Sequence, residues 1–160
     1  QIAEDAAEFA NATSVDSDTY EKMLGKTLAT AQEKIKEVMR ETESKWGGYI
    51  MKKGELFTRL ADQYLQERNT QNRTLIEKAF EQGQTYLDST KASIDRQIKA
   101  VVDFVNKTTR RVPQEYQRSL KPQVDKLRMA AITILNFQKK FDQNYDATQV
   151  EFKRMAGLID

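Results

Sequence analysis

The chain has 160 residues, of which 39% are hydrophobic and 31% charged, and its formal net charge is +2. This length supports one domain with a substantial core, and the composition excludes a disordered chain. Cysteine and histidine are both absent, which excludes disulfides, thiol and triad catalysis, structural zinc sites and histidine-bearing di-iron sites. We therefore expect a protein that is not an enzyme and that holds neither a metal nor a cofactor.

The chain opens with an acidic segment over residues 1–17. Residues 1–21, which include this segment and the first residues after it, contain six Asp or Glu residues and no Lys or Arg. Apolar residues at positions 2, 6, 9 and 10 can share one face of a short helix. No basic and apolar leader is visible, and an N-terminal Gln is compatible with a mature N-terminus. We expect this segment to fold back as a latch, with Asp16 or Asp18 within reach of the basic cluster described below.

A first long helix is expected over residues 18–67, with Ser17 or Asp18 as its N-cap. Its apolar positions change phase near Trp46. The following pair Gly47-Gly48 costs about 1 kcal/mol per glycine relative to alanine in a helix interior. A break, a kink or a local bulge is therefore expected there. The tryptophan either packs against a neighbouring helix or lies beside a ligand cavity.

A second long helix is expected over residues 70–111 and a third over 114–159. Pro113 separates them, because proline stops a helix or begins the next one. Pro122 either kinks the third helix or lies near its true start. Short turns between helices of this length require an up-down-up order. The predicted fold is all-α: one domain over 1–160, an elongated antiparallel bundle of three long helices, or four if the first one breaks, preceded by a short N-terminal helical segment.

The third helix carries the strongest pattern in the sequence. A heptad seam runs over residues 120–159, and only Gln138 and Thr148 within it are polar. Around residues 129–137 the apolar face widens, so we expect this stretch to be covered from more than one direction. The excess is either plain core or the lining of a pocket. The ligand-lining candidates are Trp46, Met129, Ile132, Ile134, Leu135, Phe137, Gln138 and Phe141.

One basic cluster surrounds the turn between the second and third helices. Residues 95–128 contain nine basic and four acidic residues. The region lacks the strongly basic, aromatic-rich character of nucleic-acid sites, so no nucleic acid is expected. An anionic membrane surface or a sulfated glycan is the functional interpretation, and the acidic N-terminal segment is the intramolecular alternative. The cluster consists of Lys107, Arg110, Arg111, Arg118 and Lys121.

Three sequons of the form N-x-Ser/Thr favour a secreted, extracellular glycoprotein. Their number exceeds chance expectation only mildly, so coincidence is the alternative. The candidate glycosylation sites are Asn11, Asn72 and Asn106. Asn106 is the weakest of them, because it follows Val105 on the expected core face.

These patterns favour a secreted, non-enzymatic helical bundle that carries a fatty acid, a phospholipid or another hydrophobic ligand in or between its helices. In its helical, cysteine-free character the chain resembles the exchangeable apolipoproteins, insect apolipophorins among them. The resemblance is one of architecture: the Pro-punctuated repeats of the vertebrate members are not present, and no residue is carried over. The alternative is a rod-like interaction or scaffold module with a dry core, whose partner is another protein.

Overall fold

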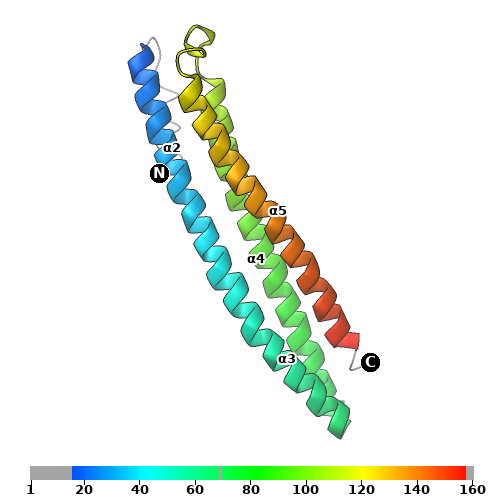
Figure 1. Cartoon of the computed structure of the whole chain (residues 1–160). Coiled ribbons are helices and arrows are strands. Elements are labelled where there is room, and N and C mark those ends of the chain that lie inside the picture. Colours follow the sequence, from blue (N-terminus) through cyan, green and yellow to red (C-terminus); the bar gives the residue numbers. More distant parts are fainter. Residues whose placement is uncertain (1–15, 69, 158–160) are drawn as a thin grey trace. The chain divides into compact units, whose positions relative to one another are not determined.

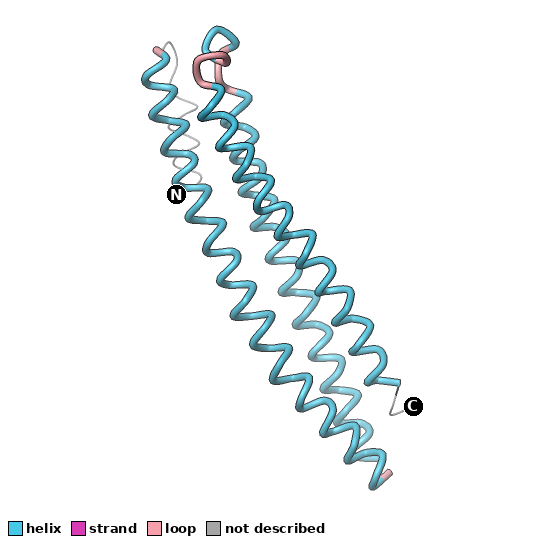
Figure 2. Tube along the Cα trace, in the orientation of Figure 1, coloured by secondary structure: helices cyan, strands magenta, loops and turns pink. Residues whose placement is uncertain are grey.

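The computed structural model describes residues 16–68 and 70–157 (Figures 1 and 2). These residues form helices and turns, and none of them lies in a β-strand. The predicted all-α fold is therefore confirmed. In chain order the elements are α2 (Ser17–Thr42), the π-helical segment η1 (Glu43–Gly47), α3 (Gly48–Glu67), α4 (Thr70–Arg110), the 3₁₀ turn η2 (Gln114–Tyr116) and α5 (Lys121–Gly157).

The helices pack as two compact units, each built from three helical segments. Unit 1 contains the described residues up to Met39 and Arg96–Gln138. Unit 2 contains Arg40–Asp95 and the described residues from Lys139 onward. Whether residues 1–160 behave as one domain depends on whether the two units unfold together, and that expectation stays a prediction.

In unit 1, α2 and α5 run in the same direction. Gln123 near the start of α5 donates a hydrogen bond of 3.0 Å to Glu21 near the start of α2. Tyr116 in η2 lies against Tyr20, with 5.7 Å between the ring centroids. The connection between α4 and α5 thus lies beside the start of α2, so α4 runs antiparallel to both of its neighbours.

Unit 2 has the same order of directions. Trp46 packs on Phe141 and Phe57 packs on Phe152, with centroid distances of 5.0 and 5.1 Å. Residue numbers therefore rise together along the first and third segments, which run parallel. Phe57 also packs on Phe80 of α4 at 4.8 Å, across the short connection that joins α3 to α4. The predicted up-down-up order is confirmed in each unit.

The first long helix does not break at Gly47-Gly48. Gly47 has φ −61° and ψ −48°, and Gly48 has φ −63° and ψ −44°, both in the right-handed helical region. The helix instead passes through the π-helical segment η1, in which Trp46 is buried. A π turn inserts extra chain and so moves the apolar face, which accommodates the phase change in the sequence. The predicted local bulge is confirmed, and the four-helix alternative is wrong.

The third helix begins later than expected. α5 starts at Lys121 rather than at residue 114, and η2 occupies Gln114–Tyr116. Pro122 is the second residue of α5, where a backbone N–H would have no partner within the helix. The Val124 N–H makes a 3.0 Å bond to the Leu120 carbonyl. Pro122 therefore marks the start of this helix.

The N-cap of α2 is Asp16, rather than Ser17 or Asp18. The backbone N–H and the hydroxyl of Thr19 donate to Asp16 Oδ1 at 2.9 and 2.8 Å, and these hydrogen bonds lower the pKa of the Asp16 carboxyl. Among the described residues, neither Asp16 nor Asp18 forms an ion pair with the basic cluster, and the Asp16 carboxylate is instead engaged in the cap. The rest of the predicted latch, residues 1–15, lies outside the described residues.

The heptad seam of α5 contributes to the core of both units. Leu127 and Ile134 are completely buried in unit 1, and Phe141 is 2% exposed in unit 2. The two polar seam residues, Gln138 and Thr148, are only half-buried. The seam therefore predicts the buried face correctly, and burial is incomplete at the two positions where its pattern is interrupted.

Candidate ligand groove

A groove of about 640 Å³ opens on the surface of unit 1 between α2 and α5. Its floor is apolar: Ile35 and Ala130 are buried, Leu28 is half-buried, and Met129 remains 58% exposed. Ala130 is short, so it leaves open the space that a longer side chain would fill. The groove is lined by Leu28, Gln32, Ile35 and Lys36 of α2 and by Pro122, Asp125, Lys126, Met129, Ala130 and Thr133 of α5.

Three of the lining residues are charged. Asp125 forms an ion pair with Lys121, with 2.6 Å between Asp125 Oδ2 and Lys121 Nζ. Neither Lys36 nor Lys126 is ion-paired with any residue that the structure describes. The uncompensated charge of the groove is therefore positive. An apolar floor with a few convergent polar groups has the composition of a small-molecule site.

Three of the predicted ligand-lining residues are core residues. Trp46 and Phe141 pack edge to face in unit 2, with an angle of 78° between their rings. Ile134 is completely buried in unit 1. The structure thus brings Trp46 and Phe141 together in the packed interior of unit 2, and neither of them lines the groove.

The other predicted ligand-lining residues lie nearer the surface. Met129 alone among the eight lines the groove. Ile132 and Leu135 are 47% and 43% exposed, and Phe137 and Gln138 are half-buried. The expectation that this stretch is covered from more than one direction is wrong for Ile132 and Leu135. In unit 1, α2 and α4 bury one stripe of α5, and Ile132 and Leu135 lie outside that stripe.

The sequence did not point to most of the groove. Leu28 and Ile35 are two of several apolar residues at helical spacing in the first helix, and the sequence assigns no role to Lys36 or Lys126. The signal in the sequence that could have indicated the groove is the apolar stripe of the first helix, which Lys36 flanks. The α5 side of the groove is about a hundred residues away in the sequence, like Gln123 from its partner Glu21, so local pattern does not show that the two sides meet.

All five residues of the basic cluster are exposed. They lie at the end of α4, in the connection that follows it, and at the first residue of α5. Lys107 and Arg110 occupy the last turn of α4, where cations interact favourably with the helix dipole. The five side chains are therefore accessible to solvent, and the helix dipole accounts for the presence of Lys107 and Arg110.

The sequons are only partly described. Asn11 lies outside the described residues, and so does the side chain of Asn72. Asn106 is half-buried on α4, and Thr108 of the same sequon is 3% exposed, its hydroxyl donating to the Phe104 carbonyl at 2.9 Å. A glycan at Asn106 would have little room, as its position beside Val105 led us to expect. Secretion and glycosylation stay predictions.

Unit 2 contains a charged cluster that the sequence did not predict. Lys91 Nζ lies 2.6 Å from Asp95 Oδ2, 3.1 Å from Asp142 Oδ1 and 5.2 Å from the centroid of the Tyr145 ring. Burial lowers the pKa of Lys91, but its hydrogen bond to Asp95 and its attraction to both carboxylates outweigh burial and leave the pKa raised. Asp142 Oδ1 is buried without a well-aligned hydrogen bond, so we regard its attraction to Lys91 as mainly electrostatic. This cluster joins α4 to α5.

A tyrosine strengthens the same junction. The Tyr145 hydroxyl donates to Asp88 Oδ1 at 2.6 Å, and this hydrogen bond raises the pKa of the Tyr145 phenol. Gln84 and Gln149 also donate to Asp88, at 2.8 and 3.4 Å. Asp88 is exposed, whereas general acid-base catalysis needs a carboxylate in a desolvated cleft. We assign this group a structural role, that of fastening α4 to α5.

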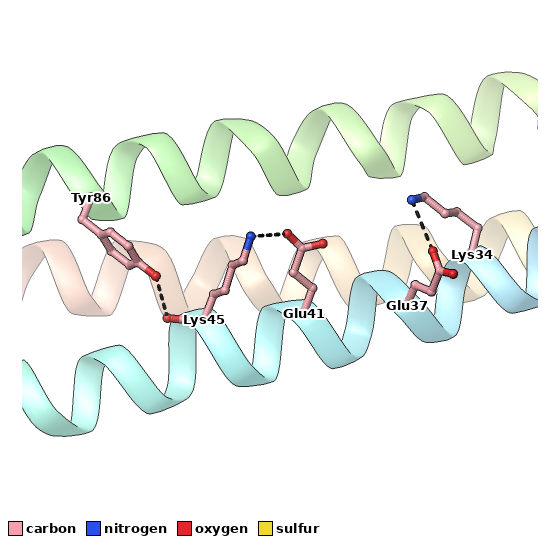
Figure 3. Close-up of polar contacts among 5 residues, drawn as sticks. All are labelled: Lys34, Glu37, Glu41, Lys45 and Tyr86. Carbon is pink, nitrogen blue, oxygen red and sulfur yellow. Dashed lines mark hydrogen bonds and ion pairs between the residues drawn. The ribbon is translucent and has the colours of Figure 1, made fainter.

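The π-helical segment η1 is also tied to α4. Figure 3 shows the Tyr86 hydroxyl pointing at the backbone carbonyl of Lys45, to which it donates at 3.5 Å. A π turn disrupts the regular ladder of backbone bonds, and Tyr86 supplies a donor beside that disruption. The Lys45 ammonium turns back to Glu41 at 2.7 Å (Figure 3), which raises the pKa of Lys45.

The part of the chain that the structure describes holds no group of three or more acidic side chains placed to bind a metal ion. None of its helices combines the length and apolar character that crossing a bilayer requires. Comparisons with family models, with curated proteins and with solved structures find no match to this chain.

Proposed function

We propose that this chain is a non-enzymatic binding protein that holds a hydrophobic ligand between α2 and α5 of unit 1. The observation that carries the proposal is the groove of about 640 Å³ with its apolar floor. Met129 on that floor is 58% exposed, so its apolar surface is open to a ligand. The exposure is local, because the cores of both units contain completely buried side chains. Covering apolar surface contributes roughly 25 cal/mol per Å², so a hydrocarbon ligand gains by binding there.

The proposed setting is extracellular. Three sequons in a cysteine-free helical chain support a secreted glycoprotein that carries a fatty acid, a phospholipid or a similar ligand. In the same setting, the exposed basic cluster around the α4–α5 connection is proposed to meet an anionic membrane surface or a sulfated glycan. Binding to anionic vesicles or to heparin that weakens steeply with salt would support that second surface.

The proposal that the chain carries a hydrophobic ligand is tested by titrating the whole chain with dodecanol in a calorimeter. Thr133 is an exposed residue of the groove wall, so Thr133→Trp fills the groove without disturbing the core. Ala100→Trp adds the same side chain to an exposed position on α4 and is the matched control. We expect the parent and the control to bind, and Thr133→Trp to lose about tenfold or more in affinity. Absence of binding to the parent, or equal binding by both variants, would overturn the proposal.

A protein-protein interaction module is the second candidate. Ile132 and Leu135, at 47% and 43% exposure, form an apolar stripe on α5 that does not line the groove. Exposed apolar stripes of this kind often mark surfaces that bind another protein. Mass spectrometry of a lipid extract separates the two candidates. A stoichiometric lipid on the purified protein favours the carrier, and a lipid-free protein favours the interaction module.

A further inference from the structure

The two uncompensated cations of the groove lie at different levels along it. The Glu21–Gln123 hydrogen bond fixes a common level for α2 and α5, which run parallel. From that level, Lys36 lies fifteen residues further along α2, and Lys126 lies three residues further along α5. At 1.5 Å per residue the two levels are about 18 Å apart. The groove therefore has two distinct ends.

The two ends differ in charge. Asp125 lines the groove beside Lys126, so the end nearer the start of α5 holds a carboxylate. At the other end the polar lining residues are Lys36 and the neutral Gln32 and Thr133, and no carboxylate lines it. Glu37 is the next residue along α2, but it pairs with Lys34 at 3.4 Å (Figure 3). The Lys36 end is therefore the one that favours an anion.

Between the two ends the groove offers an apolar track. Leu28 and Ile35 form its α2 side, and Met129 and Ala130 form its α5 side. A narrow track with a cation at one end matches a single hydrocarbon chain that carries one negative head group. The lysine ammonium supplies a point charge, and the Gln32 amide supplies a neutral donor beside it.

Building on the proposed function, we propose that the ligand is a single-chain lipid with a carboxylate head group. Its head binds between Lys36 and Gln32, and its tail follows the apolar floor toward Pro122. This assigns both a chemical class and a direction to the ligand. A charged contact at a solvent-exposed lysine is modest in strength, so the head group selects the ligand while the tail supplies most of the affinity.

The test compares three ligands that share one chain: dodecanoate, dodecanol and dodecyltrimethylammonium. We expect dodecanoate to bind the parent about fivefold more tightly than dodecanol at low salt, and the cationic ligand to bind most weakly. Lys36→Glu should abolish the preference for dodecanoate over dodecanol. Lys99→Glu, at an exposed position on α4 outside the groove, changes the net charge equally and should keep the preference.

The outcomes separate this inference from the function on which it rests. Equal binding of the three ligands, lost in Thr133→Trp, would keep the carrier and overturn the head-group assignment. A preference removed by Lys126→Glu but not by Lys36→Glu would overturn the proposed direction. If light scattering shows a dimer that Thr133→Trp converts to a monomer, a second copy of the chain occupies the groove, and the lipid assignment fails. No binding of any ligand overturns both proposals.

Discussion

The two units share one topology but have different cores. In unit 1 the buried side chains are mainly aliphatic, whereas in unit 2 about half of them are aromatic. The completely or almost completely buried aliphatic residues of unit 1 include Leu24, Val38, Ile98, Val101, Val105, Leu127 and Ile134. The buried aromatic residues of unit 2 are Trp46, Phe57, Tyr64, Phe80, Phe141 and Phe152.

This difference corresponds to two ways of joining helices. Aromatic pairs prefer defined angles and contribute about 0.5–1.5 kcal/mol beyond the area they bury. Phe57 meets Phe152 at 85°, and the Lys91–Asp142 and Tyr145–Asp88 contacts add directional links between α4 and α5. Aliphatic packing has no such directional preference. We infer that unit 2 is specified by contact geometry, while unit 1 can adjust the α2–α5 groove to a ligand.

The largest effect that tests this comparison is expected for Phe57→Ala. Phe57 is 2% exposed and packs on both Phe80 and Phe152. Removing a buried phenyl ring costs roughly 3–5 kcal/mol. Denaturant unfolding should be followed by the fluorescence of Trp46, which reports on unit 2, and by far-UV circular dichroism, which reports on the whole chain.

The same experiment tests whether residues 1–160 form one domain. In a single cooperative domain, Phe57→Ala shifts the fluorescence and dichroism transitions together. A fluorescence transition that moves alone would show that the units unfold separately and would contradict the single-domain prediction. If neither transition moves, Phe57 is not part of a packed core.

The corresponding test of the aliphatic core is Ile134→Ala beside Leu127→Ala. Both side chains are completely buried in unit 1, so each truncation should cost on the order of 2–5 kcal/mol. Ile132→Ala on the same helix removes the same atoms from a residue that is 47% exposed, and it should cost much less. A distinctly smaller loss at Ile134 than at Leu127 would indicate that unit 1 already contains free space near Ile134.

Much of the fold could be predicted because a heptad repeat encodes helix, direction and buried face together. The seam of α5 identifies Leu127, Ile134 and Phe141 as core, and the phase change near Trp46 signals the π segment. The start of α5 was left open between residue 114 and Pro122, because Pro113 is as good a helix start as Pro122 by local rules. The contact of Tyr116 in η2 with Tyr20 is tertiary, and local sequence does not carry it.

The candidate site was less predictable than the fold. The widened apolar face of α5 was expected to line an interior pocket, yet Ile132 and Leu135 face outward and only Met129 reaches the groove. The groove depends on the register between α2 and α5, and a periodic pattern leaves that register open. Lys36 and Lys126 gain their significance only when both helices are placed.

Two glycines offer a matched comparison of the units. A Cβ on Gly83 in unit 2 would lie 2.9 Å from Phe57 Cζ and 3.3 Å from Phe152 Cε2, whereas a Cβ on Gly25 in unit 1 has no such neighbour within 4 Å. Alanine gains about 0.5–1 kcal/mol over glycine in a helix interior, while overpacking costs about 1–3 kcal/mol. We expect Gly25→Ala to stabilise the protein and Gly83→Ala to destabilise it by about 1 kcal/mol. Stabilisation by both, measured by thermal unfolding, would show that the aromatic core of unit 2 adjusts easily.

The smallest expected effect concerns the Tyr145–Asp88 hydrogen bond. Tyr145→Phe removes a 2.6 Å bond at a half-buried site, so it should destabilise the protein by less than about 1 kcal/mol near neutral pH. The bond raises the pKa of the Tyr145 phenol above its unfolded value of about 10. Its contribution is therefore complete below pH 10 or so and is lost as the pH rises through the folded-state pKa.

Unfolding in urea over a series of pH values should show this loss. The stability difference between the parent and Tyr145→Phe should be constant from neutral pH to about pH 10 and then shrink. Tyr116→Phe in unit 1 is the control, because the Tyr116 hydroxyl makes no hydrogen bond to a residue that the structure describes. A difference that persists unchanged into strong alkali would mean that the Tyr145 hydroxyl does not donate to Asp88. The directional link between α4 and α5 in unit 2 would then rest on Lys91 and its two carboxylates.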